Sequence, residues 1–112
     1  MPDELGPLRD RLRSFAGARD WDKYHTPRNL ALALCGEAGE LAAELQWVAD
    51  AEVAEHLSDP RARERLGAEV ADVLLYLVRF ADVCGLDLLA EAYAKIERNE
   101  LRLPVPGGHV PR

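Results

Sequence analysis

Apolar residues recur at intervals of three and four along most of the chain, which is the spacing of a single helix face. This pattern predicts four main helices, over about residues 4–18, 27–50, 60–84 and 88–101, and a weaker short helix over about residues 51–57. The stripes of the first three helices are Leu5, Leu8, Leu12 and Phe15; Leu30, Leu34, Leu41, Leu45 and Val48; and Leu66, Val70, Val73, Leu77, Phe80 and Cys84. Because no strand pattern is present, we predict an all-α, four-helix-bundle-like fold.

Cap and stop residues mark the ends of these helices. Thr26 and Asp59 are each followed by proline, the combination that favours a helix start, and Asp87 is placed to cap the last helix. Gly85 is placed to end the third helix. Four proline and glycine residues near the C-terminus forbid regular structure, so we expect residues 103–112 to form a flexible tail.

Composition bounds the class of protein. A chain of 112 residues with 48% hydrophobic content fits one domain, residues 1–112. Its net charge of -6 argues against nucleic acid or a membrane surface as partner. No apolar run approaches membrane-spanning length, and the start is acidic where a signal peptide would be positive. Cys35 and Cys84 lie in apolar segments and are expected to be buried thiols. We therefore predict a cytoplasmic protein.

Two acidic pairs at helical spacing stand out, Glu37/Glu40 and Glu69/Asp72. At about 100° per residue, Glu37 and Glu44 fall about 60° and 80° from Leu34, on the shoulder of the second stripe, with Glu40 about 120° away. Glu69 falls inside the third stripe and Asp72 at its edge. Carboxylates that point toward a core are costly unless a cation neutralises them, so these acids predict a divalent metal site.

The alternative is that these acids are ordinary surface carboxylates, some paired with arginines. Glu52/Glu55 and Glu97/Glu100 have the same spacing, so spacing alone is weak evidence. The position of the two chosen pairs beside apolar stripes favours the metal site. Carboxylates without histidine at ligand spacing suit Mg²⁺ or Mn²⁺ and poorly suit zinc or copper. No Glu-x-x-His motif is present, which argues against a di-iron bundle.

Several motifs together resemble those of the MazG-like all-α nucleoside triphosphate pyrophosphohydrolases, and most closely those of the dCTP pyrophosphatase branch. They are Arg19-Asp-Trp-Asp-Lys-Tyr-His-Thr-Pro-Arg-Asn-Leu30, Glu37-Ala-Gly-Glu-Leu41, Gln46-Trp47 and Glu69-Val-Ala-Asp-Val-Leu-Leu-Tyr-Leu77. The family signature is Glu-x-x-Glu, a spacer and Glu-x-x-Asp. The resemblance spans about residues 8–104.

The resemblance implies Mg²⁺-dependent hydrolysis of a dCTP-like or non-standard nucleoside triphosphate to its monophosphate and pyrophosphate. In this family the acids matching Glu37, Glu40, Glu69 and Asp72 bind the metal, and one of the glutamates is a candidate general base. Glu44 is either an auxiliary acid or a surface residue. The resemblance also implies a homo-oligomer, specifically a tetramer built from dimers, and long amphipathic helices in a short chain agree with association.

The same resemblance implies a set of substrate-binding residues. They are Trp21, His25, Asn29, Trp47, Tyr76, Lys95, Asn99 and Arg102. Each has a simpler alternative: the tryptophans as core ends, the histidine as a loop hydrogen-bonder, the tyrosine as bundle filling, and the last three as a solvated face. Arg28 is a further phosphate candidate, or it pairs with an acid of its own helix.

Two departures from the family pattern concern base selectivity. Leu12 and Arg13 stand where some members carry a histidine, and Leu103-Pro104 stands where relatives often have Tyr-Pro. Two rival functions remain open. One is a related pyrophosphohydrolase of another nucleotide, such as a phosphoribosyl nucleotide or an alarmone. The other is a catalytically inactive helical interaction module, against which the intact acidic motifs argue.

Overall fold

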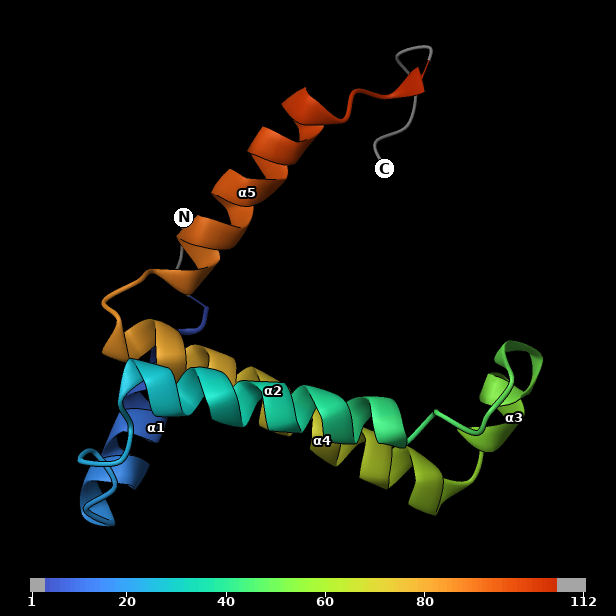
Figure 1. The fold of residues 1–112 in the computed structure, drawn as a ribbon, viewed down its shortest axis with the longest axis horizontal. Coiled ribbons are helices and arrows are strands. Elements are labelled where there is room, and N and C mark those ends of the chain that lie inside the picture. The colour runs from blue at the N-terminus through green and yellow to red at the C-terminus, as the bar shows by residue number, and fades with distance from the viewer. Residues whose placement is uncertain (1–3, 107–112) are drawn as a thin grey trace.

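Apolar stripes and capping residues produce an all-helical chain, seen in a computed structural model that describes residues 4–106 (Figure 1). Its elements, in chain order, are α1 (Gly6–Ala18), α2 (Pro27–Ala43), the 3-10 helix η1 (Asp50–Glu52), α3 (Val53–His56), α4 (Pro60–Val83) and α5 (Leu88–Arg102). The described residues contain no strand, which confirms the predicted fold class. Residues 107–112 of the predicted tail lie outside the described residues.

The predicted helix starts are confirmed by their capping hydrogen bonds. The Thr26 hydroxyl accepts from the backbone N–H of Asn29 at 3.2 Å, and Pro27 opens α2. The Asp59 carboxylate accepts from the N–H of Arg61 at 3.2 Å at the start of α4. Asp87 caps α5 in the same way. These local interactions satisfy backbone donors that a helix start leaves free.

Two helices end in the same left-handed turn. At the end of α4, Gly85 has φ +71° and the N–H of Leu86 donates to the carbonyl of Ala81 at 2.8 Å. At the end of α1, Asp20 has φ +56° and the N–H of Trp21 donates to the carbonyl of Ala16 at 3.0 Å. Both are Schellman-type ends, in which a residue with positive φ reverses the chain. The turn at the end of α1 reverses the chain just before Trp21.

The predicted end of the second helix was wrong, because α2 ends at Ala43 and not near residue 50. Beyond Ala43 the backbone tightens, and the N–H groups of Glu44, Leu45 and Val48 donate to carbonyls three residues back at 3.0–3.2 Å. The apolar spacing continues through these turns, and no glycine or proline marks the boundary. Trp47 therefore lies beyond the helix that the pattern assigned to it.

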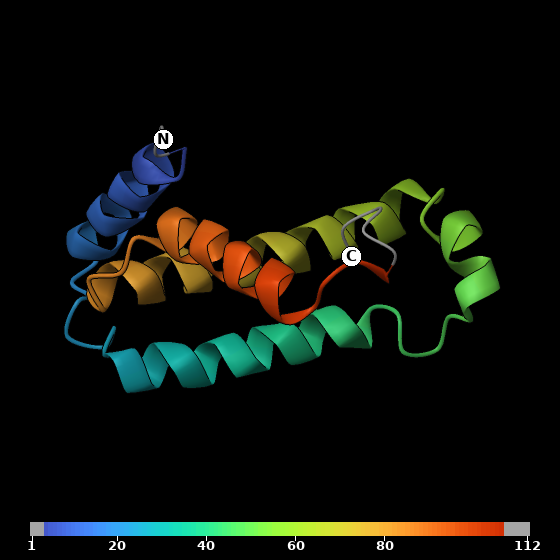
Figure 2. The same ribbon diagram turned by 90° about the horizontal axis from the view of Figure 1, so that it is seen from above.

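The antiparallel pair of α2 and α4 is the centre of the fold, and α1 packs across α4 (Figure 2). The short α3 lies where the chain turns from α2 into α4. The core is small and is built mostly of small side chains that let the helices approach closely. Its fully buried apolar residues, within the described part, are Ala16, Leu30, Ala62, Val78 and Ala81.

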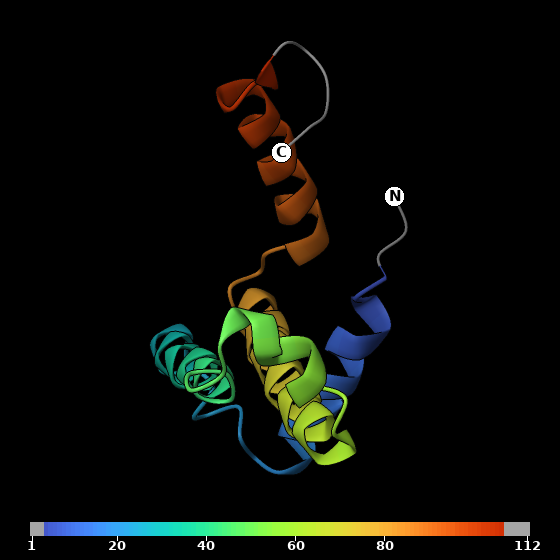
Figure 3. The same cartoon turned by 90° about the vertical axis from the view of Figure 1, so that its right-hand side faces the viewer.

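The last long helix stands apart from the others. Figures 1 and 3 show α5 projecting away from the α2/α4 pair, and large apolar residues of this helix, such as Tyr93, Ile96 and Leu101, are exposed. The radius of gyration is 17.5 Å, against about 13 Å for a compact domain of this length. The four predicted long helices are present, but a single chain leaves the bundle open.

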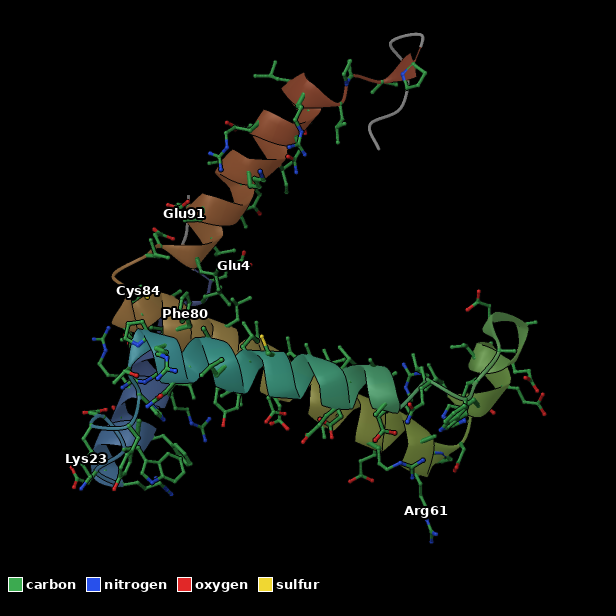
Figure 4. The ribbon with its side chains drawn as sticks, in the orientation of Figure 1. Glu4, Lys23, Arg61, Phe80, Cys84 and Glu91 are labelled. Carbon is green, nitrogen blue, oxygen red and sulfur yellow. The ribbon has the colours of Figure 1, made fainter. Side chains whose placement is uncertain are left out.

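Both cysteines are free and exposed, so the prediction of buried thiols was wrong. Cys84 is the residue that ends α4, where the chain leaves the core, as Figure 4 shows. Cys35 is an exposed residue within α2. Periodicity marks apolar positions but does not tell which side of a short helix pair is covered. Within residues 4–106, no helix combines the length and apolar character needed to cross a membrane.

The turn at the end of α4 predicts opposite effects for two glycine substitutions. A Cβ at Gly85 or at Gly67 would meet no atom within 4 Å. The two substitutions therefore differ only in backbone conformation, which has a positive φ at Gly85 and is helical at Gly67. Gly85→Ala should lower the free energy of unfolding by about 1–2 kcal/mol because of its positive φ. Gly67→Ala, inside α4, should raise it by about 0.5–1 kcal/mol. Urea unfolding checks both values, and equal effects would contradict the assigned turn.

Candidate active site

Three glutamates meet where α2 and α4 lie side by side. Glu37 and Glu40 lie one turn apart on α2, and Glu69 comes from α4. One carboxylate oxygen from each lies within 4.8 Å of the other two. Because the two helices run antiparallel, residues far apart in sequence reach the same point, as the acidic pairs predicted.

Two of these carboxylates are placed in a costly position. Glu37 Oε2 and Glu69 Oε2 are buried and have no hydrogen-bond partner, whereas Glu40 is exposed. Burial raises the pKa of the Glu37 and Glu69 carboxyl groups, and the charges of Glu40 and Asp72 raise it further. A buried acceptor without a donor, among like charges, is what a bound cation would relieve.

Asp72 lies beside this cluster without belonging to its closest group. It is half-buried on α4, one turn beyond Glu69, and its charge acts on both Glu37 and Glu69. It also lines the neighbouring cavity. The structure therefore brings three of the four predicted acids together and places the fourth between them and the cavity.

The donor set fits a hard divalent cation. The clustered atoms are carboxylate oxygens from glutamates, with no histidine or cysteine in the group that the described residues form. Mg²⁺ and Mn²⁺ prefer such oxygen ligands, and the two unpartnered oxygens leave positions open for them.

A cavity of about 150 Å³ adjoins the acids through Asp72. Three of the predicted substrate-binding residues, Trp21, His25 and Tyr76, line it. The ring of Trp21 meets the ring of Phe15 edge-on, with centroids 5.4 Å apart, and lies 6.1 Å from that of His25. The remaining lining residues are Leu12, Ala16, Leu30, Leu75 and Arg79. An aromatic and apolar lining with a few polar groups is typical of a site for a flat ring.

Arg79, which no sequence motif marked, is part of the wall of this cavity. Arg79 is only 8% exposed. Its Nε–H donates to His25 Nδ1 at 3.0 Å, and its two terminal nitrogens donate to Asp22 at 2.8 Å and Asp82 at 3.3 Å. Its position in the sequence could have indicated this role, because Arg79 comes three residues after Tyr76 and seven after Asp72 and so lies on the same helix face.

Arg13 completes this network from α1. Its guanidinium donates to both carboxylate oxygens of Asp82, at 2.6 and 3.0 Å. This pairing lowers the pKa of Asp82 below its ordinary value. Burial lowers the pKa of His25, and the charge of Arg79 lowers it further. Two arginines and two aspartates thus surround a histidine whose pKa lies below its ordinary value.

The structure does not bring the other predicted substrate-binding residues to the cavity. The Asn29 side chain, in the first turn of α2, donates to the carbonyl of Tyr24 in the preceding loop at 3.0 Å. Trp47 is 89% exposed and lines a separate hollow with Val48, Glu52, Glu55 and His56. Lys95, Asn99 and Arg102 lie on α5, which projects away from the α2/α4 pair.

Two other candidate residues named from the sequence are Glu44 and Arg28. Glu44 follows the last residue of α2 as its C-cap, is half-buried, and pairs with Arg65 at 3.4 Å. Arg28 is exposed at the start of α2.

Comparison with solved structures decides the family. A pyrophosphatase from Archaeoglobus fulgidus DSM 4304 superposes with a TM-score of 0.84 and 37% sequence identity, over 90% of this chain and 93% of that one. The chain belongs to the MazG-like pyrophosphatase family. Its resemblance to that family, given by the acidic motifs, is thereby confirmed.

Curated members of this family are similar over most of the chain. Proteins named dCTP pyrophosphatase 1 from Rattus norvegicus and Homo sapiens are each 47% identical, over 90% and 89% of this chain. The chain spans about three-fifths of their length, 59% in each case. No family model matches the sequence.

The crowded carboxylates predict a stability gain when one charge is removed. In the absence of metal at neutral pH, Glu69→Gln should raise the Tm by a few degrees, because it removes a buried charge and keeps the shape. The folded pKa of Glu69 lies above its unfolded value, so the advantage of the variant should shrink as the pH falls through the folded pKa and Glu69 becomes neutral. Thermal melts across pH check both effects.

Mg²⁺ provides the matched measurement. It should raise the Tm of the wild type and have much less effect on Glu69→Gln. Glu64→Gln, an exposed acid of the same helix, should behave as wild type. A Tm of Glu69→Gln below wild type without metal would contradict the unrelieved repulsion.

Proposed function

We propose that this chain is a Mg²⁺-dependent nucleoside triphosphate pyrophosphohydrolase that converts a dCTP-like or non-standard deoxynucleotide to its monophosphate and pyrophosphate. The observation that carries the proposal is the pair of buried, unpartnered oxygens of Glu37 and Glu69 next to an aromatic cavity. A cation site and a ring site that share Asp72 suit a substrate with phosphates at one end and a base at the other.

In this proposal Glu37, Glu40, Glu69 and Asp72 hold the metal. When bound, Mg²⁺ supplies charge neutralisation for the triphosphate and polarises the phosphorus that is attacked. The acids keep their positions because they project from two packed helices, which fix them better than loops would. Mn²⁺ is expected to substitute, since it takes the same ligands.

In the proposed reaction the protein positions one water molecule for attack on the nucleotide. Water attacks the α-phosphorus, the bond from this phosphorus to the bridging oxygen breaks, and pyrophosphate leaves. A glutamate oxygen without a donor of its own accepts the proton of the water. Glu37 and Glu69 carry such oxygens, and the carboxylate oxygen that does not bind the metal is the one available to accept the proton.

The cavity supports a pyrimidine base over a purine. A cavity of about 150 Å³ is the size that holds a single six-membered ring, as an engineered protein cavity of that volume holds benzene. Trp21 and Tyr76 offer ring faces for stacking. The names of the curated relatives, dCTP pyrophosphatase 1, agree with this choice. Because deoxynucleotides are made and used inside the cell, the proposal includes a cytoplasmic location.

A homo-oligomer, specifically a dimer of dimers, is part of the proposal. The accessible surface of the chain is 8505 Å², whereas a folded monomer of 12.4 kDa exposes about 6,100 Å². The exposed apolar residues of α5 and the exposed Trp47 favour contact with another protein surface. We infer that Trp47, Lys95, Asn99 and Arg102 complete the site of a neighbouring copy. Asn29 acts in the proposed site only by shaping the loop that carries His25.

Pyrophosphate release from a panel of nucleotides tests the reaction. Wild-type protein with Mg²⁺ should turn over dCTP and other pyrimidine deoxynucleotides faster than purine ones, and chelation should abolish turnover. Glu40→Gln should lower kcat by about 100-fold or more, because it removes a ligand charge. Glu64→Gln should retain wild-type activity. No metal-dependent turnover of any nucleotide, phosphoribosyl nucleotides and alarmones included, would refute the proposal.

Subunit mixing tests the completion of one site by another copy. Glu40→Gln and Trp47→Ala should each be impaired alone, but coexpressed chains should recover roughly a quarter of wild-type turnover, because half of randomly paired dimers hold one intact site. The control is coexpression of Glu40→Gln with Glu69→Gln, which lie in one chain's cluster and should give no recovery. Activity of the first mixture no higher than the mean of its parents would place Trp47 in its own chain's site.

A further inference from the structure

Arg79 is the one buried charged residue in the part of the chain that the structure describes, and its hydrogen bonds are specific. It is held by two carboxylates, Asp22 from the loop after α1 and Asp82 one turn along α4. The third bond joins Arg79 Nε–H to His25 Nδ1 at 3.0 Å. The guanidinium is thus fixed on both sides of the bond that it makes to the histidine.

This bond determines where the proton of His25 lies. Arginine has donors only, so the nitrogen that receives its N–H must carry a lone pair. A neutral imidazole has one N–H, and with Nδ1 as acceptor that N–H is on Nε2. Among the described residues, no hydrogen bond of Nε2 is found. His25 lines the cavity, which leaves Nε2–H available to a bound molecule.

We propose that Arg79 is a positioning residue that fixes His25 as the neutral Nε2–H tautomer, so that the cavity offers a donor to an acceptor on the base. This inference rests on the proposed function and names the feature of the base that the site selects. The 2-oxo group and the unprotonated N3 of cytosine are two adjacent acceptors on one ring edge. A ring edge that carries only donors would leave the N–H of His25 unpaired.

The surrounding charges keep this arrangement in one state. Protonation of His25 would turn Nδ1 into a donor facing the Arg79 donor and would place two cations in contact. Asp22 favours the charged form of His25, but its charge is already matched by Arg79. The other titratable groups of the cavity, Asp72 and Tyr76, come from α4. The lowered pKa of His25 agrees with this balance.

The tautomer is tested on wild-type protein without nucleotide. Long-range ¹H–¹⁵N correlation spectra at pH 7 distinguish the two neutral tautomers from the imidazolium form. The chain has three histidines, and comparison with His25→Gln assigns the resonances. We expect the Nε2–H pattern for His25. An Nδ1–H tautomer or a charged ring would overturn the proposal whatever the enzyme does, and this measurement does not depend on whether an Arg79 variant folds.

Kinetics tests what the tautomer does. Arg79→Met keeps much of the side-chain stem and removes the donors. It should raise the KM for dCTP about 10-fold, the value of one hydrogen bond of about 1.4 kcal/mol, with kcat within about 3-fold of wild type. His25→Gln combined with Arg79→Met should be no worse than the larger single effect, because both remove the same contact. In the Arg79→Met spectrum, His25 should show mixed tautomers.

The control is Arg61→Met. Arg61 is an exposed arginine of the same helix, and its side chain points away from the molecule in Figure 4. This variant should leave KM and the His25 spectrum unchanged. If folded Arg79→Met binds dCTP as wild type does, the inference is wrong while the proposed function stands. If wild type hydrolyses no nucleotide, the proposed function fails and the role of this donor in base recognition fails with it.

Discussion

The structure depends on placing carboxylates where water and donors do not reach them. Glu37 Oε2 and Glu69 Oε2 are buried without partners, and Glu40 and Asp72 add like charges nearby. Such a group is tolerated only if rigid neighbours hold it. The antiparallel pair of α2 and α4 supplies that rigidity, and the caps at Thr26 and Asp59 fix where each helix begins. The crowded carboxylates therefore lower the stability of the folded chain, and the packing of α2 against α4 keeps them in place.

Local interactions explain which features could be predicted from the sequence. The starts of α2, α4 and α5 follow from a cap and its neighbours within three residues, and the end of α4 follows from Gly85. The acids could be predicted because helical phase relates each one to the apolar stripe on its own helix. The end of α2 could not, because its last turns keep the apolar spacing while the hydrogen bonds tighten.

The remaining features depend on long-range contacts that no local pattern contains. Arg79 meets His25, 54 residues earlier in the chain, and Arg13 meets Asp82 across 69 residues. The exposure of Cys35 and Cys84 depends on which helix faces are covered. The exposure of Tyr93, Ile96 and Leu101 on α5 likewise depends on how the whole chain packs. For these, composition and period give the residue types, and only the packed chain gives the partners.

The turn of helix between Asp72 and Tyr76 has a consequence for the shape of any substrate. Asp72 adjoins the acids, Tyr76 lines the ring cavity, and both belong to α4. Four residues of α-helix rise about 6 Å, and a helix inside a packed pair does not stretch. Helix α4 therefore fixes the distance between the residues that would meet the phosphates and the base of the proposed nucleotide. One pentose spans such a gap, whereas a molecule with a second sugar between its base and its reactive phosphate overshoots it.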